Sequence, residues 1–183
     1  MGLNLALRAR SAACRALFRL HGFQSSDVVC IDRLPLVYGE GSVLIRGKLV
    51  VRCRIAQCEI GAAENGRLEI GHRVVINQGA SIVAHHWIEV GDDARIGDFV
   101  AVYDSNFHAV DPHHPVRSAP VTIGANAWLG RGVMVMPGSK IGDHTVVAAG
   151  SVVTGELPPR VLAVGSPARV VRELDIPDGW RRG

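Results

Sequence analysis

One histidine in an irregular segment is the residue of this sequence best suited to acid–base chemistry. His108 opens the stretch "HAVDPHHPVRSAP", which holds three prolines and interrupts a regular pattern on either side. Histidine has an ordinary pKa that suits proton transfer near neutral pH, and loops that leave a regular framework often carry function. Position alone leaves two possibilities open: His108 is a general base, or it is a structural residue at the edge of the fold.

The elements that must position this histidine repeat every six residues. After the irregular segment, aliphatic side chains recur at Ile123, Leu129, Val135, Ile141, Val147 and Val153. Before it, they recur at Ile70, Ile76, Ile82 and Ile88 and, after a two-residue slip, at Val90, Ile96 and Val102, with a weaker first turn at Val43, Leu49 and Ile55. This period fits neither an α-helix nor a plain strand. It predicts an all-β solenoid in which three hexapeptides close one triangular coil. A β-sandwich is the alternative, but it does not require an unbroken six-residue register.

The chain divides into three segments. We expect a helical cap and lead-in over residues 1–40, a β-helix over 41–155 with an active-site loop at 104–120, and a strand with a basic tail over 156–183. Residues 3–20 favour a helix with four arginines and no acidic residue. Such a helix could make a peripheral contact with an anionic membrane. We expect it instead to cover the open end of the solenoid, because a terminal coil needs a cap.

Composition restricts the class of protein. The net charge of +3 gives no argument for nucleic-acid binding, and no apolar run approaches the ~20 residues of a membrane span. The four cysteines lack CxxC or zinc-ribbon spacing, so we expect free thiols. Arginines stand where a signal peptide needs its apolar stretch, and the sequence therefore predicts a cytoplasmic protein.

The motifs after the irregular segment resemble a known family. "SNFHAVDP", "APVTIGANAWLG", "AAGSVVT" and "VGSPARVVRE" are similar to the galactoside and maltose O-acetyltransferase branch of the hexapeptide-repeat acyltransferases. The similarity covers roughly residues 60–173. It implies a left-handed parallel β-helix, a homotrimer with active sites between neighbouring chains, and acetyl-CoA as the donor without a required metal.

The resemblance also assigns roles to individual residues. It implies that His108 removes the proton of the acceptor hydroxyl, and that Asn77, His85 and Trp128 contact the acceptor. It implies a coenzyme A site formed by Ala149, Thr154, Arg169 and Arg172. Guanidinium groups suit the phosphates of that ligand. Two departures stand out: Gly155 replaces the lysine usual in the family, and His85 and His86 replace an acidic residue near the acceptor, which leaves the acceptor open.

These observations predict an acetyl-CoA-dependent O-acetyltransferase that acts on a hydroxyl of a sugar or glycan precursor. Two alternatives stay open. The γ-class carbonic anhydrases are also β-helix trimers, and the spacing of His72, His108 and His113 is similar to that of their three zinc ligands. The other alternative is a non-catalytic scaffold, against which the presence of His108 argues. The "AAGSVVT" and "VGSPARVVRE" segments favour coenzyme A over a metal.

Overall fold

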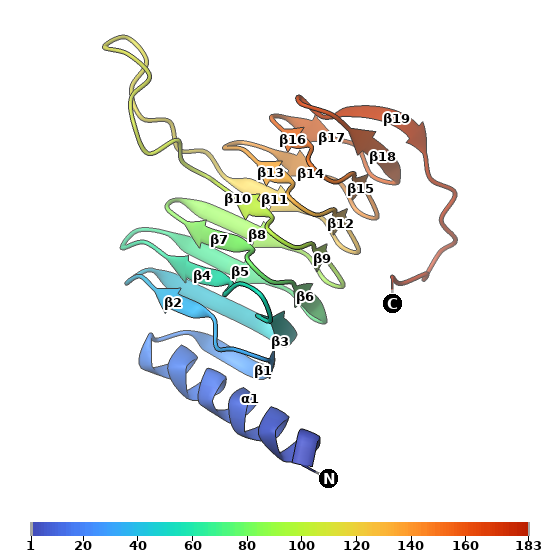
Figure 1. Cartoon of the computed structure of the whole chain (residues 1–183). Helices are drawn as coiled ribbons and strands as arrows, with labels where there is room; N and C mark the ends of the chain where they lie inside the picture. The colour runs from blue at the N-terminus through green and yellow to red at the C-terminus, as the bar shows by residue number, and fades with distance from the viewer. Residues whose placement is uncertain (1, 183) are drawn as a thin grey trace.

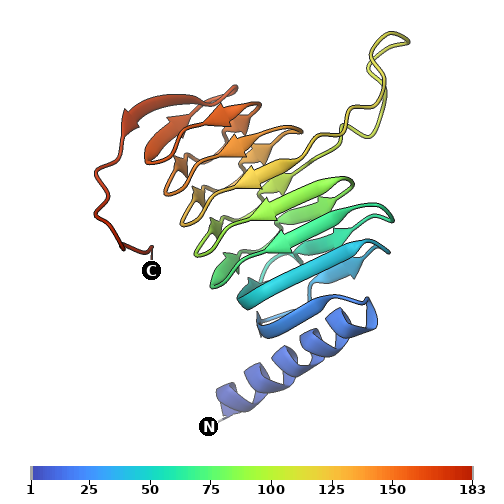
Figure 2. The same ribbon diagram turned by 180° about the vertical axis from the view of Figure 1, so that it is seen from behind.

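Each hexapeptide forms one short strand and one turn, as the period predicts. The computed structural model describes residues 2–182, and β5 (Arg67–Ile70), β6 (Val74–Ile76) and β7 (Ser81–Ala84) form one complete coil in it. The following coils consist of β8 (Trp87–Val90), β9 (Arg95–Ile96), β10 (Ala101–Val102), β11 (Val121–Ile123), β12 (Trp128–Leu129), β13 (Met134–Val135), β14 (Lys140–Ile141), β15 (Val146–Val147), β16 (Val152–Val153), β17 (Glu156–Leu157) and β18 (Val161–Val164). The result is the expected left-handed parallel β-helix, with about six turns (Figures 1 and 2).

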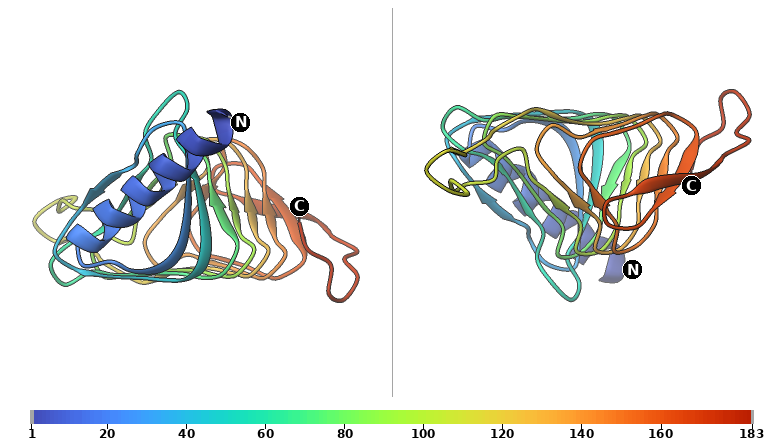
Figure 3. Two further views of the ribbon diagram at one scale, coloured as in Figure 1. Left: turned by 90° about the horizontal axis from the view of Figure 1, so that it is seen from below. Right: turned by 90° about the horizontal axis from the view of Figure 1, so that it is seen from above.

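The coils stack into a prism with three faces, which Figure 3 shows along its axis. One face carries β6, β9, β12, β15 and β18, each paired in parallel with the next. We call it the Trp128 face. A second face carries β4 (Glu59–Ala62), β7, β10, β13 and β16, after β2 (Leu36–Tyr38). The third carries β5, β8, β11, β14 and β17. The long strand β3 (Ser42–Arg52) pairs with both β5 and β6 and so joins the third face to the Trp128 face in one sheet.

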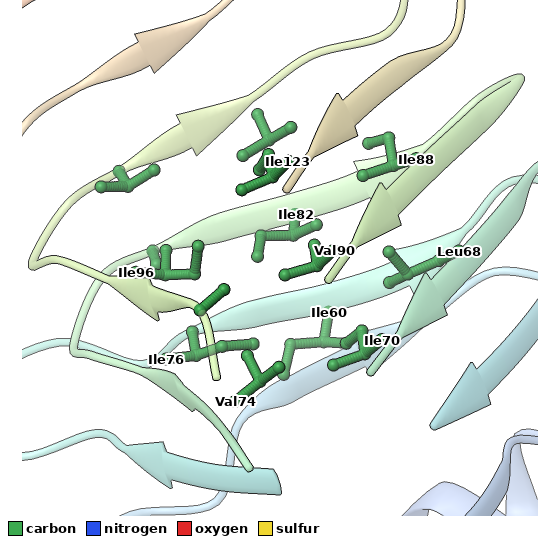
Figure 4. Packing of buried hydrophobic residues seen from close by; sticks show 14 of the residues in the cluster. Ile60, Leu68, Ile70, Val74, Ile76, Ile82, Ile88, Val90, Ile96 and Ile123 are labelled. Atoms are coloured by element: carbon green, nitrogen blue, oxygen red, sulfur yellow. The ribbon is translucent and has the colours of Figure 1, made fainter. Parts of the chain in front are cut away.

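The predicted aliphatic column forms the core. Its members from Ile70 to Val153 are at most 2% exposed, and Figure 4 shows part of their packing. The prediction of a weaker first turn was only partly right, because Val43 and Leu49 are buried whereas Ile55 is 70% exposed. The reason is that β3 buries alternate residues, as an ordinary strand does, so the six-residue register begins only after it.

Glycine follows several core residues because successive coils approach closely at one edge. A Cβ on Gly91 would lie 2.6 Å from the backbone nitrogen of Ala125, and one on Gly124 would lie 2.6 Å from that of Asp143. The same turns need left-handed backbone, which Asp93 and Asn126 supply with φ of 58° and 55°. Aspartate and asparagine tolerate that conformation better than most residues, so the turn sequences follow from the geometry.

The N-terminal helix covers the first coil. α1 (Gly2–Leu20) packs on β1 (Gln24–Ile31), with Cys14 and Phe18 fully buried, and the Arg15 guanidinium donates a hydrogen bond to the carbonyl of Val28 (3.1 Å). Its apolar side therefore faces the solenoid. Among the described residues there is no helix with the length and apolarity that a membrane span requires.

The stacked strands extend beyond residues 41–155 at both ends. β1 and β2 already pair in parallel with β3 and β4, and β17 and β18 continue the stack after residue 155. β19 (Arg169–Glu173) then pairs with β18 in antiparallel fashion. The final segment, Leu174–Arg182, which we call the C-terminal tail, turns back beside the Trp128 face (Figure 1).

Candidate functional site

The irregular segment forms a projecting arm between β10 and β11. Residues 103–120 leave the prism and return as a paired hairpin, which stands away from the body in Figures 1 and 2. Ser105 and Ser118 form an antiparallel bridge, and the Arg117 N–H donates to Asn106 Oδ1 (2.7 Å). The arm is thus an ordered hairpin that presents its side chains outside the prism.

A buried aspartate fixes the base of the arm. Asp104 is fully buried, and its carboxylate accepts the backbone N–H groups of His85 (2.9 Å) and His86 (2.8 Å) in the preceding coil. From the sequence, Asp104 and Asp111 are the two aspartates of the loop that could orient the His108 ring. The structure assigns other partners to both carboxylates, because Asp111 lies 2.8 Å from His114 Nδ1. The anchoring role of Asp104 was missed, since no sequence pattern distinguishes it from a solvated loop aspartate.

His108 lies on the outer part of this arm. The chain passes through left-handed backbone at Phe107 (φ 59°), and the His108 N–H donates to the carbonyl of Asn106 (2.7 Å). The His108 side chain is exposed. The six-residue register continued from Val102 would predict that His108 ends the core column, but this is wrong, because the chain leaves the coil after Val102 and the next coil resumes at β11. An exposed imidazole at this place is free to meet a substrate.

His85 lies on the same edge as His108. Its ring packs edge-on against Phe107, with 4.8 Å between centroids, and Phe107 also contacts Tyr103 at 5.7 Å. The arm therefore brings His85 close to the residue that precedes His108. We call this edge, which follows β7, β10, β13 and β16, the arm edge.

Asn77 and Trp128 share a pocket on the Trp128 face. The Asn77 Nδ2 donates to the carbonyl of Ile96 (3.1 Å), which leaves its Oδ1 available as an acceptor. Trp128 is 44% exposed. An open pocket of about 400 Å³ is lined by Arg52, Val75, Asn77, Arg95, Trp128 and Arg182.

Within one chain, the arm-edge histidines lie apart from the pocket that contains Asn77 and Trp128. Asn77 precedes β7 and His85 follows it, so the width of one face of the prism separates them. The projecting arm and the C-terminal tail lie on opposite sides of the prism in Figures 1 and 3. A single chain therefore does not place His108 beside Asn77 or Trp128.

The four residues expected to bind coenzyme A are exposed, and they too lie on different edges of the prism and on β19. Ala149 lies in the turn between β15 and β16, on the edge that contains Asn77, whereas Thr154 follows β16 on the arm edge. Arg169 and Arg172 lie on β19. Arg172 lines a pocket of about 640 Å³ that also includes Trp128 and the C-terminal tail.

The C-terminal tail contributes to both pockets, which the sequence did not indicate. The Arg182 N–H donates to Asn126 Oδ1 (2.8 Å), and Arg95 Nη2 donates to the carbonyl of Arg182 (2.5 Å). The Arg182 guanidinium lies over the rings of Trp128 and Trp180, at 5.5 and 4.9 Å from their centroids. The sequence itself predicts only a basic tail here.

The histidines of the metalloenzyme alternative are not gathered in one chain. His72 lies in the turn between β5 and β6, whereas His108 and His113 lie on the arm. Within residues 2–182, no group of three or more histidine, cysteine, aspartate or glutamate side chains is placed to hold a metal ion.

Comparisons with known proteins agree with the geometry. Residues 120–155 match the family model "Bacterial transferase hexapeptide (six repeats)". The chain is 39% identical over 114 residues to the galactoside O-acetyltransferase of Escherichia coli K12, a match that covers 59% of this chain and 55% of that protein. The chain thus spans about half the length of this relative.

Two solved structures extend the comparison over most of the chain. The structure of PerB from Caulobacter crescentus in complex with CoA and GDP-perosamine is 30% identical, with a TM-score of 0.57, and the match covers 90% of this chain and 65% of PerB. The D94A mutant of AntD, an N-acyltransferase from Bacillus cereus in complex with dTDP and coenzyme A, is 23% identical, with a TM-score of 0.68 and coverage of 88% and 89%, and shows the fold alone. The chain therefore carries a hexapeptide repeat over residues 120–155 and has the left-handed β-helix fold of the acyltransferases to which it is similar.

Proposed function

We propose that this protein is an acetyl-CoA-dependent O-acetyltransferase that modifies a hydroxyl of a sugar or glycan precursor. The observation that supports this most is the 39% identity to galactoside O-acetyltransferase over 114 residues, beside a hexapeptide-repeat match at residues 120–155. An exposed histidine on an arm beside that repeat suits the chemistry. Because acetyl-CoA is the donor, we expect the enzyme to act in the cytoplasm.

His108 acts as the general base in this proposal. Its neutral imidazole accepts the proton of the acceptor hydroxyl while the hydroxyl oxygen attacks the thioester carbonyl. The C–S bond then breaks, and the imidazolium returns the proton to the departing thiolate. Both substrates meet in one cleft, so no covalent acyl-enzyme is needed. Asn77 Oδ1 accepts a hydrogen bond from the acceptor, Trp128 packs against its ring, and His85 flanks it on the arm edge.

In this proposal the coenzyme contacts exposed residues of the last coils. Ala149 carries only a methyl group, and its backbone stacks on that of Gly130, where a Cβ would meet the Ala149 nitrogen at 2.6 Å. Because these two residues have little or no side chain, this edge leaves room for an extended pantetheine arm. The Thr154 hydroxyl is exposed and can donate a hydrogen bond, and Arg169 and Arg172 can pair with phosphates.

The active site forms between chains of a homotrimer. The separation of His108 from Asn77 and Trp128 within one chain supports this proposal, because an arm from one chain can reach the Trp128 face of its neighbour. The arm also exposes Val110 (78%), Val116 (50%) and Phe107 (42%). Apolar side chains on a projecting hairpin are what an interface would cover.

The test replaces His108 with alanine. His108→Ala should lower kcat for acetyl transfer to a sugar acceptor by about 10²- to 10⁴-fold, the usual contribution of a general base. The rise in melting temperature on adding acetyl-CoA should be unchanged, because the imidazole is not assigned to the coenzyme. His114→Ala serves as the matched control on the same arm and should retain activity. Parent-level turnover in His108→Ala would rule out this base.

A further inference from the structure

The pocket beside Trp128 brings three arginines together and has no carboxylate in its lining. These arginines are Arg52, Arg95 and Arg182. Arg95 donates to the backbone carbonyls of Arg73 and Asp93, both at 2.9 Å, but these oxygens orient its guanidinium without neutralising it.

The buried carboxylate of Asp93 interacts with the charge of Arg95, but its hydrogen bonds go to another arginine. Asp93 accepts two hydrogen bonds of 2.7 Å from Arg73, in a bidentate pair. This pair also lowers the pKa of Asp93 below its usual value, although burial opposes the shift. No salt bridge joins Arg52, Arg95 or Arg182 to a carboxylate within residues 2–182. Three like charges therefore face one open pocket.

Arg182 is held in this pocket by specific contacts. Its backbone N–H donates to Asn126, its carbonyl accepts from Arg95, and its guanidinium is stacked against two indoles. Its Nε is buried and has no hydrogen-bond acceptor among the described residues. Burial and the charge of Arg95 lower the pKa of Arg182. A buried donor without an acceptor is costly and calls for a ligand oxygen.

We propose that Arg52, Arg95 and Arg182 form a binding subsite for a phosphate or diphosphate group carried by the acceptor. The acceptor is then a sugar phosphate or a nucleotide-linked sugar rather than a neutral sugar. The guanidinium forks pair with phosphate oxygens, while Asn77 and Trp128 in the same pocket receive the sugar ring. The identity of the acceptor in this inference rests on the proposed function, whereas the binding of an anion at these arginines does not.

The subsite and the pocket that contains Arg172 share Trp128 and Arg182, but they differ in their other arginines. Arg52 and Arg95 lie on the early coils, on one side of Trp128, whereas Arg172 lies on the other side among the last strands. The coenzyme phosphates are assigned to Arg169 and Arg172. An anion at Arg52 therefore comes from the second substrate.

Binding of inorganic pyrophosphate, measured by calorimetry at constant ionic strength, tests the subsite. Arg52→Ala should raise its Kd about tenfold, and Arg182→Ala should do the same, since each removes one charge-assisted hydrogen-bonding group. Arg54→Ala is the matched control, because Arg54 is exposed two residues away and outside the pocket, and its Kd should change less than twofold. Galacturonate distinguishes a carboxylate ligand, and tighter binding of galacturonate than of pyrophosphate would overturn the assignment to phosphate.

Binding of coenzyme A is the second measurement of the test. Its Kd should be the same in Arg52→Ala and in the parent protein. An equal loss of coenzyme A and pyrophosphate binding would mean that these arginines serve the coenzyme, and the inference would fail. Because these measurements require no turnover, an inactive protein that binds pyrophosphate refutes only the proposed function. An active acetyltransferase that does not bind pyrophosphate refutes only the subsite.

Discussion

Glu69 shows how single side chains on the outside of the prism can set stability. It is only 4% exposed, and its carboxylate pairs with both Arg46 on β3 and Arg67 on β5. Burial alone would raise the pKa of Glu69, but the hydrogen bonds and charges of the two arginines hold it below the ordinary value of 4.5. The carboxylate therefore links two coils through charge.

This pairing predicts a pH-dependent stability. Because the pKa of Glu69 is lower in the folded than in the unfolded protein, its contribution is present above pH 4.5 and is lost as the pH falls through the folded pKa. Glu69→Gln should lower the free energy of unfolding by about 1–2 kcal/mol at pH 7 and by much less at pH 3.5. Denaturant titrations at both pH values measure this, with Glu89→Gln, the cross-strand neighbour, as control. An equal loss at both pH values would contradict the ion-pair explanation.

At the same scale, sequence and structure agree on some site residues and differ on others. Asn77 and Trp128 do share a pocket, and His108 is exposed on an arm. The sequence could not reveal that Asp104 anchors that arm or that Arg182 reaches Trp128, because both depend on where distant segments return. Local motifs carry no such information.

At the scale of elements, the repeat was the most informative feature. A six-residue period leaves one inward position per strand, so the buried column could be identified residue by residue. The period is absent in β3, which buries alternate residues, and in β19, whose five residues are all exposed. The limits of the solenoid were therefore harder to locate than its centre, and the pairing continues beyond both expected boundaries.

The helix α1 provides a prediction at this scale. Phe18 is fully buried, and its ring lies 5.3 Å from that of Phe23, whereas Leu20 is 85% exposed. Phe18→Ala should lower the free energy of unfolding by about 3 kcal/mol, because it leaves a cavity between the cap and β1. Leu20→Ala should change it by less than about 0.5 kcal/mol. If Phe18→Ala has no effect in thermal or denaturant unfolding, the helix does not act as a cap.

At the scale of the whole molecule, the proposed site is divided between two separated parts of one chain. The arm edge carries His85 and His108, and the Trp128 face carries the pocket with Asn77. Closed cyclic assembly would place the arm of each chain against the face of the next, so that every interface holds one complete site. This arrangement predicts that two inactive variants complement each other.

Two inactive variants should restore activity when they assemble together. In this arrangement His108→Ala lacks the base and Asn77→Ala lacks the acceptor contact, so each homotrimer is inactive. When equal amounts are refolded together and mix at random, about one interface in four receives an intact arm from one chain and an intact face from another. Acetyl transfer should therefore return to about a quarter of the parent rate. A double variant carrying both substitutions, mixed with the parent protein, controls for the mixing itself. If the mixture of single variants stays inactive while sedimentation shows that mixed trimers form, His108 and Asn77 act within one chain or not in the same site.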